Sequence, residues 1–193
     1  MKLITINDCH IGGPHQIHSH DEILYTLNYA QYPVAYLGDN YDVANCKRDE
    51  VWKIISQKKL IYTKMRQQDV FCRGNHGLNC IHAPDSHFKD GILFEHGDYL
   101  FWGNERADKF RSQKPGAGWF KRNLITRPLD SLRWLKDPHL NDTAKRYIDA
   151  LPSTIHTIIC GHRHPTGNIV EKYNGRSVLI LKRGIQTIDL ENV

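Results

Sequence analysis

Five short apolar runs, each followed at once by Asp, Asn or His, constrain the fold of this chain more than any other feature. They occupy residues 3–6, 34–37, 70–72, 92–94 and 155–160. Runs of this length are typical of buried β-strands. Between the first three, apolar residues recur at helical spacing, so strands and helices alternate. This alternation predicts an α/β fold with right-handed crossovers and a largely parallel sheet.

The residues that follow these runs are of the types that bind transition metals. In chain order they are Asp8, His10, Asp39, Asp42, Asn75, His76, His96, His162 and His164. Ligands of open α/β sheets bind beyond the carboxyl ends of the strands, so the five loops are expected to meet there. Imidazole nitrogens combined with carboxylate and amide oxygens suit Mn, Fe or Zn better than Ca or Mg. The pattern therefore predicts a metal site.

The spacing within the motifs supports the same prediction. In Asp8-x-His10 and His162-x-His164, alternate side chains of an extended segment point to the same side. Any one motif, taken alone, is better explained as ordinary turn residues and solvated histidines. Five such motifs in order, each after an apolar run, favour a shared site.

On these motifs the chain resembles the calcineurin-like metallophosphoesterase superfamily. The matching blocks are Asp8-x-His10, Gly38-Asp39-x-x-Asp42, Gly74-Asn75-His76, His96 and Gly161-His162-x-His164. The resemblance covers about residues 1–100 and 155–193. It implies an α/β fold of two packed mixed β-sheets flanked by helices, an αββα sandwich. Residues 1–193 would form this single domain, with a small helical insert at residues 101–150.

The resemblance also implies a metal-binding role for seven of these residues. Asp8, His10 and His164 would hold one divalent ion. A second ion would be held by Asn75, His96 and His162. Asp39 would bridge the two ions, because a carboxylate has two oxygens. Mn is the favoured metal, with Fe or Zn as alternatives.

The catalytic role falls, by the same resemblance, to His76. It would donate a proton to the leaving-group oxygen or contact a non-bridging oxygen, and Asp42 would orient it. Asp42 could instead be a turn-capping residue. Asn75 and Arg163 are the candidate substrate-binding residues. Arg163 stands where the family often has Thr, and it could reach a phosphate or simply face solvent.

The predicted function is hydrolysis of a phosphoester by metal-activated water at a dinuclear metal centre. The substrate class stays open between monoester, nucleotide and diester. One alternative is a nuclease or nucleotide phosphodiesterase, whose partner would be a nucleotide or nucleic acid. A non-catalytic binding module on the same fold is the other alternative. It is less favoured because every ligand position and the catalytic histidine are filled.

Positive charge is concentrated in residues 101–136, which contain nine basic and three acidic side chains, whereas the whole chain carries a net charge of +5. Several aromatic residues are interleaved with these bases. The stretch 101–150 is predicted to be a helical, basic, cap-like insert that recognises an extended phosphorylated substrate. The bases expected to contribute are Arg111, Lys114, Lys121 and Arg122. The alternative is a helical layer with a solvated basic rim.

The remaining composition indicates a cytoplasmic protein. The five cysteines include no C-x-x-C pair, which disfavours a disulfide framework or a zinc ribbon. No apolar run is long enough to span a membrane, and residues 3–6 are too few for a signal-peptide core. His15, His18 and His20 follow the first motif, where they could form a third metal site or a solvated loop.

Overall fold

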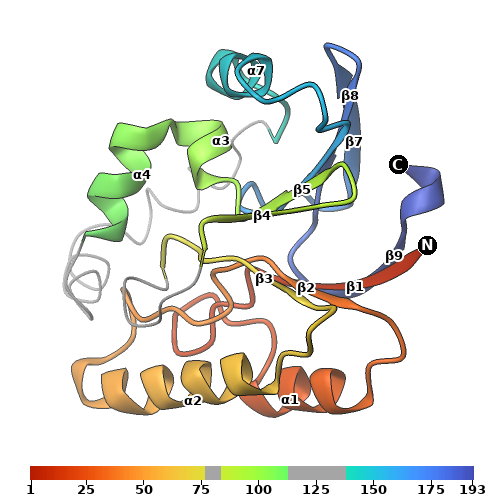
Figure 1. Ribbon diagram of the computed structural model, residues 1–193. Helices are drawn as coiled ribbons and strands as arrows, with labels where there is room; N and C mark the ends of the chain where they lie inside the picture. The colour runs from red at the N-terminus through yellow and green to blue at the C-terminus, as the bar shows by residue number, and fades with distance from the viewer. Residues whose placement is uncertain (77–83, 113–137) are drawn as a thin grey trace.

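The computed structural model describes residues 1–76, 84–112 and 138–193 (Figure 1). These residues form two mixed β-sheets packed against each other, with helices on the outer face of each. The α/β fold of two packed mixed sheets flanked by helices is therefore confirmed. The prediction of largely parallel strands is wrong at the sheet edges. One edge strand of the first sheet and both edge strands of the second run antiparallel to their neighbours.

The first sheet has four strands in the order β3-β2-β1-β9. Their bounds are β1 Lys2–Asn7, β2 Val34–Tyr36, β3 Val70–Phe71 and β9 Gly184–Asp189. Strands β1, β2 and β3 are parallel, and β9 runs antiparallel to β1. The three apolar runs near the start of the sequence are thus three parallel neighbours, as the crossover argument requires.

The second sheet has five strands in the order β4-β5-β6-β8-β7. Their bounds are β4 Ser86–Lys89, β5 Ile92–Glu95, β6 Thr157–Cys160, β7 Ile169–Tyr173 and β8 Arg176–Ile180. Asn174 and Gly175 join β7 to β8 with φ of 48° and 74°, a hairpin turn that an Asn-Gly pair favours. The sequence reading did not predict β4, although Asp90 and Gly91 form the same kind of turn before β5.

Three apolar clusters fill the spaces between the layers. One lies between the first sheet and helices α1 and α2, one lies between the two sheets, and one lies between the second sheet and helices α3 and α7. Strand β6 contributes to two of them, because Ile159 faces the first sheet and Ile158 faces the helices. Both are fully buried, and burying such a side chain stabilises the fold by roughly 1.5–3 kcal/mol.

The helices fall into two sets (Figure 1). Their bounds are α1 His20–Tyr29, α2 Val51–Lys64, α3 Asp98–Trp102, α4 Asn104–Arg111 and α7 Asp142–Asp149, with 3-10 turns at Arg48–Glu50 and Leu190–Asn192. Helices α4 and α7 belong to the stretch 101–150, whose residues 113–137 lie outside the described part. None of the described helices combines the length and apolar character needed to cross a membrane.

Backbone hydrogen bonds tie the loops at the carboxyl ends of the strands to one another. The N–H groups of Asp8 and His10 donate to the carbonyls of Gly38 and Asp39, at 3.1 and 3.0 Å. In the second sheet the N–H of Gly161 donates to the carbonyl of His96 at 3.0 Å. The loops that carry the predicted site are therefore held together by main-chain hydrogen bonds, independently of their side chains.

Candidate metal centre

The nine predicted strand-end residues lie together where the carboxyl ends of β1, β2, β3, β5 and β6 meet. Among the described residues, three groups of side chains could each hold a metal ion, their ligand atoms lying within 4.8 Å of one another. The groups are Asp8, His10 and His164; His10, Asp42 and His76; and Asp39, His96 and His162. Asn75 adjoins the third group. The structure brings the residues together, and their individual roles stay predictions.

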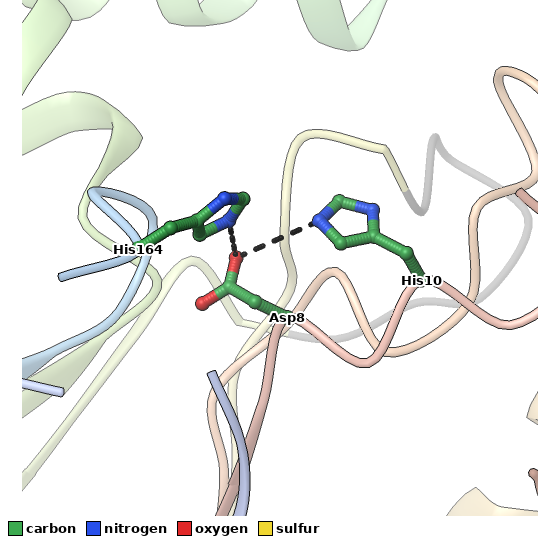
Figure 2. Close-up of side chains that lie close together, drawn as sticks. All are labelled: Asp8, His10 and His164. Atoms are coloured by element: carbon green, nitrogen blue, oxygen red, sulfur yellow. Dashed lines mark hydrogen bonds and ion pairs between the residues drawn. The ribbon is translucent and has the colours of Figure 1, made fainter. Parts of the chain in front are cut away.

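The first group is built around the carboxylate of Asp8 (Figure 2). Its Oδ1 lies 3.0 Å from Nε2 of His164 and 4.0 Å from Nε2 of His10. Two atoms bound to one ion at ~2.1 Å lie ~3.0–4.2 Å apart, depending on the angle between the bonds. Both distances fall in this range, so the group fits a single small cation.

The other oxygen of Asp8 is already used by the protein. Oδ2 accepts hydrogen bonds from the backbone N–H of His162 and from the side-chain amide of Asn7, each at 3.0 Å. These bonds link the loop after β1 to the loop after β6. They also fix the carboxylate so that Oδ1 is presented to the two imidazoles.

The third group converges on one nitrogen of His96. Its Nε2 lies 2.8 Å from Oδ1 of Asn75, 3.0 Å from Oδ2 of Asp39 and 3.1 Å from Nδ1 of His162. The other ring nitrogen, Nδ1, lies 3.0 Å from the carbonyl oxygen of Leu37. A carbonyl oxygen only accepts hydrogen bonds, so Nδ1 carries the proton and donates it.

With its proton on Nδ1, neutral His96 presents a lone pair at Nε2 to two oxygens that also carry lone pairs. Such an arrangement requires positive charge at its centre. Burial lowers the pKa of His96, but the neighbouring carboxylate of Asp39 raises it to about 10. A second proton can therefore supply the charge, and so can a divalent cation, which would use every lone pair at once. The donor set fits a metal ion.

His10 gives a second reason to expect a cation. Its side chain is 2% exposed, and neither ring nitrogen makes a hydrogen bond within the described part of the chain. Nδ1 lies 3.5 Å from Oδ2 of Asp42, too far for a good bond. A buried polar atom without a partner costs about 1–3 kcal/mol, and ligation of an ion would remove that cost. Burial also lowers the pKa of His10, which favours the neutral form that binds metals.

The carboxyls of the centre are ionised. Burial alone would raise the pKa of Asp8, Asp39 and Asp42, but nearby imidazoles hold each of them below its usual value. The main opposing residue is His164 for Asp8, His96 for Asp39 and His76 for Asp42. Negative charge is thus available for cations at neutral pH.

His76 belongs to the second group, and its imidazole faces the carboxylate of Asp42, which Asn45 holds in turn. Its Nδ1 lies 2.8 Å from Oδ1 of Asp42, a buried carboxylate oxygen that also accepts from the side-chain amide of Asn45 at 2.7 Å. The amide nitrogen of Asn45 lies 2.7 Å from the same imidazole nitrogen. The backbone N–H of His76 donates to Oδ1 of Asp39 at 2.6 Å. Sequence reasoning missed Asn45, although an Asp and an Asn three residues apart are typical of such a turn.

Backbone geometry sets the centre apart from the rest of the fold. Seven described residues other than glycine have positive φ, and two of them, Asp90 and Asn174, form hairpin turns. The remaining five are all predicted metal ligands: Asp8, His10, Asp39, His162 and His164. Left-handed conformations cost of order 1–3 kcal/mol each outside glycine, and they cluster at functional sites. The expectation that Asp8-x-His10 and His162-x-His164 are extended is therefore wrong, because the four aspartate and histidine residues of these motifs are left-handed.

Two motif glycines are explained by contact with the ligands. A Cβ at Gly74 would lie 2.2 Å from Oδ1 of Asp39, and one at Gly161 would lie 2.4 Å from Oδ2 of Asp8. Real Cβ atoms essentially never approach this closely. The glycines therefore permit the close approach of two loops to the buried carboxylates.

Aromatic side chains of the helical layer contact the centre. The ring of Trp102 packs edge-on against His162 with centroids 4.3 Å apart, and Phe110 lies 5.3 Å from His76. Trp102 and Phe110 also contact each other at 5.6 Å. We call these two residues the aromatic wall. The wall thus contacts both His76, in the loop after β3, and His162, in the loop after β6.

The two arginines considered from sequence occupy different settings. Arg163 lies between His162 and His164, with its guanidinium 4.9 Å from the ring of Phe101. Arg111, expected to contact substrate, is 3% exposed and makes two bonds of 2.7 Å to Asp98. It is enclosed by protein partners, so the expectation that it contacts substrate is wrong. Lys114, Lys121 and Arg122 lie outside the described residues.

The early histidines are not gathered into a metal group within the described residues. His18 Nδ1 lies 3.3 Å from a carboxylate oxygen of Glu22, and His20 Nδ1 lies 2.5 Å from the hydroxyl of Tyr41. Neither belongs to the three candidate groups. These contacts favour a structural role for both.

Comparison with known proteins finds similarity among solved structures alone. No protein-family model matches it, and no curated protein matches it in sequence. Among solved structures, it is similar to Vps29 complexed with zinc from Entamoeba histolytica, at 17% identity over 95% of this chain and 74% of that one, with a TM-score of 0.42. Vacuolar protein sorting 29 from Cryptosporidium parvum has 14% identity over 94% and 74%, with a TM-score of 0.43.

A predicted phosphoesterase from Streptococcus pneumoniae is similar to the same degree. It has 14% identity to this chain, with 97% of this chain and 83% of that one covered and a TM-score of 0.42. Identities and TM-scores this low assign neither a family nor an activity. The case for function therefore rests on the geometry of the centre.

Proposed function

We propose that this chain is a dinuclear metal-dependent phosphoesterase of the calcineurin-like type, formed as one domain by residues 1–193. The observation that carries the proposal is the meeting of Asn75, Asp39 and His162 at a lone pair of His96, a set that a divalent cation would satisfy. A second such set, around Asp8, lies at the same edge of the fold. Two adjacent cation sites of mixed nitrogen and oxygen donors suit phosphoester hydrolysis.

The seven ligands divide between two ions. Asp8, His10 and His164 would hold the first, and Asn75, His96 and His162 the second, as their separate groupings favour. Asp39 would bridge. Two divalent ions, Mn in our proposal with Fe or Zn as alternatives, would supply an activated water and neutralise charge on the phosphoryl group.

His76 is the proposed proton donor to the leaving group. Its Nδ1 faces the Asp42 carboxylate, which would stabilise the imidazolium form, so that the proton on Nε2 is the one donated to the leaving-group oxygen. Asp42 would act as a positioning residue for the imidazole, and Asn45 would hold the Asp42 carboxylate by donating to it from its side-chain amide. Asn75 would also contact the phosphoryl group, and Arg163 would do so after leaving the ring of Phe101.

The test combines metal analysis with a hydrolysis assay. The protein is loaded with Mn, dialysed and assayed on p-nitrophenyl phosphate and bis(p-nitrophenyl) phosphate, which distinguish monoester from diester preference. We expect about two ions per chain and hydrolysis that EDTA abolishes and Mn restores. A His96→Gln variant should bind less metal, whereas His87→Gln, on strand β4 and outside the three candidate groups, should behave as wild type.

Two results would contradict the proposal. One is a wild-type protein that holds no divalent ion after dialysis. The other is a fully loaded protein that hydrolyses neither ester with Mn, Fe or Zn, which would favour a metal-binding module without catalysis.

A further inference from the structure

A cavity opens beside the candidate centre, on the side of the helical layer. Its volume is about 770 Å³, within the usual range for small-molecule sites. It is lined from three helices by Trp102, Gly103, Asn104, Glu105, Arg106, Lys109, Phe110, Thr143 and Arg146. The aromatic wall forms part of this lining, and the wall also contacts His76 and His162. The aromatic wall therefore lies between the cavity and the candidate metal centre.

The lining combines two chemistries. Three basic side chains, Arg106, Lys109 and Arg146, face one acidic side chain, Glu105, so the cavity favours an anion. The guanidinium of Arg106 lies 5.0 Å from the ring of Trp102, which shows that the wall already accepts a flat cationic group over its face. Flat rings that stack on aromatic side chains and guanidinium planes suit the same surface.

The basic side chains of the cavity differ from the buried arginine on the same helix. Arg106 and Lys109 are exposed, as is Arg146 on α7, whereas Arg111 is enclosed by Asp98 and other partners. Within the part of the chain that the structure describes, none of these three bases is held in an ion pair as Asp98 holds Arg111, so they stay available to a ligand in the cavity. Their placement next to the centre suits a ligand that reaches from the phosphoryl group into the cavity.

We propose that this cavity, the nucleotide pocket, binds the part of a phosphorylated substrate that carries a flat ring and further negative charge, as in a nucleotide. The proposal rests on the proposed function, since the centre would hold the phosphoryl group while the pocket holds the remainder. The aromatic wall would stack the base, and Arg106, Lys109 and Arg146 would bind anionic groups. A free nucleotide and the terminal nucleotide of an oligonucleotide share this chemistry.

The experiment measures binding by isothermal titration calorimetry with Mn-loaded protein. Adenosine monophosphate is compared with inorganic phosphate and with ribose 5-phosphate, which lacks the flat ring. In the wild type we expect adenosine monophosphate to bind about tenfold or more tightly than either. Base stacking on aromatic side chains contributes ~1–3 kcal/mol, which corresponds to this preference.

A triple variant tests the bases. With Arg106→Gln, Lys109→Gln and Arg146→Gln combined, the preference for adenosine diphosphate over adenosine monophosphate should fall by about tenfold, because the second phosphate supplies the further negative charge and exposed charge pairs contribute up to ~1 kcal/mol each. The matched control removes three exposed charges from helix α2 by Lys53→Gln, Lys59→Gln and Lys64→Gln. The control should retain the wild-type preference.

A 5′-phosphorylated pentadeoxynucleotide distinguishes the two sources of the ligand. Binding weaker than that of adenosine monophosphate means a free nucleotide, and tighter binding means a nucleic acid end. The pocket proposal is overturned if adenosine monophosphate binds no better than ribose 5-phosphate, or if triple and control variants behave alike.

The same titrations separate this proposal from the proposed function. Adenosine monophosphate is also titrated into metal-free protein in EDTA. If the protein binds no Mn, the dinuclear function fails, while sensitivity of the metal-free titration to the triple variant alone still supports the pocket. If Mn binds and the aryl esters are hydrolysed but the triple variant has no specific effect, only the pocket fails.

Discussion

The candidate centre and the nucleotide pocket lie side by side, but they are built in opposite ways. Asp8, Asp42 and His96 are fully buried, and their loops are held by backbone bonds and by two close-packed glycines. The pocket instead takes its charges from exposed side chains on short helices. A substitution in the first region disturbs many contacts at once, whereas one in the second changes a single surface group. Such a division allows the specificity of a site to change while its chemistry stays.

Among substitutions in the buried centre, Asp39→Asn is expected to have the largest effect on metal binding and hydrolysis. If Asp39 bridges two ions, the loss of one carboxylate charge weakens both sites, so bound metal should fall below one ion per chain after dialysis. Hydrolysis should fall by at least ~10³-fold, because several kcal/mol of charge stabilisation are lost. Metal analysis and steady-state rates on an aryl phosphate provide the measurement.

An exposed acid supplies the matched control for that variant. Asp21→Asn, in the first turn of helix α1, removes the same charge from the surface and should alter neither quantity. An Asp39→Asn protein that keeps two ions would end the bridging assignment.

His76→Ala separates catalysis from metal binding within the buried region. His76 is proposed to move a proton and not to ligate, so the variant should retain its metal and lose activity by roughly 10²–10⁴-fold. The loss should be smaller for esters of p-nitrophenol than for alkyl esters, because a good leaving group needs little protonation. Rates for a series of leaving groups, together with metal content, provide the test.

His87→Ala is the matched histidine control and should resemble the wild type. Equal losses across the leaving groups would count against the proton-donor role. A His76→Ala protein without metal would mean that His76 is a ligand, which its membership of the group with His10 and Asp42 also allows.

Arg111→Met tests whether the buried arginine of helix α4 stabilises the fold, unlike the exposed bases of the same helix. Arg111 comes from helix α4 but is bound to Asp98, which is 1% exposed, and it contacts Asp85, so the change would leave a buried carboxylate without its partner. Removing one member of a buried pair typically costs ~3–5 kcal/mol of unfolding free energy. Urea unfolding should detect a loss of this size.

Two further variants complete the unfolding experiment. Lys109→Met changes an exposed base on the same helix and should alter stability by less than ~0.5 kcal/mol. Asp98→Asn added to Arg111→Met should recover part of the loss, because it removes the unpaired charge. Equal stability of Arg111→Met and wild type would show that the ion pair contributes nothing net.

The sequence predicted the parts of the fold that depend on local pattern. The apolar runs that became β1, β2, β5 and β6 could be identified because a buried strand leaves a continuous apolar signature. The Asn174-Gly175 turn follows from residue preference alone. Strand β4 was missed because its residues are largely exposed and give no such signature.

The meeting of the site residues could be predicted, but not their surroundings. Parallel strands place their carboxyl ends at one edge, so the convergence of Asp8, Asp39 and His96 followed from topology. The burial of Arg111 depends on Asp98 and Asp85, which reach it from other segments. The contact of Trp102 with His162 joins residues 60 positions apart, and no local pattern encodes such a pair.

The pairing of β1 with β9 has a consequence for how the chain is made. These strands pair over their whole length, from Lys2 opposite Asp189 to Asn7 opposite Gly184. During synthesis, one edge of β1 stays unpaired until β9, nearly 180 residues later in the chain, has been made. Contacts so distant along the chain slow folding, because a large loop must close before they form.

The same order of synthesis applies to the ligands. Asp8 is synthesised 154 residues before His162, and both His162 and His164 follow strand β6. A nascent chain that ends before β6 therefore contains the carboxylates and imidazoles that the finished fold buries, but it lacks the two histidines that contact them. The candidate centre can therefore be completed only after β6 has been synthesised, so any cation that stabilises it acts after that point.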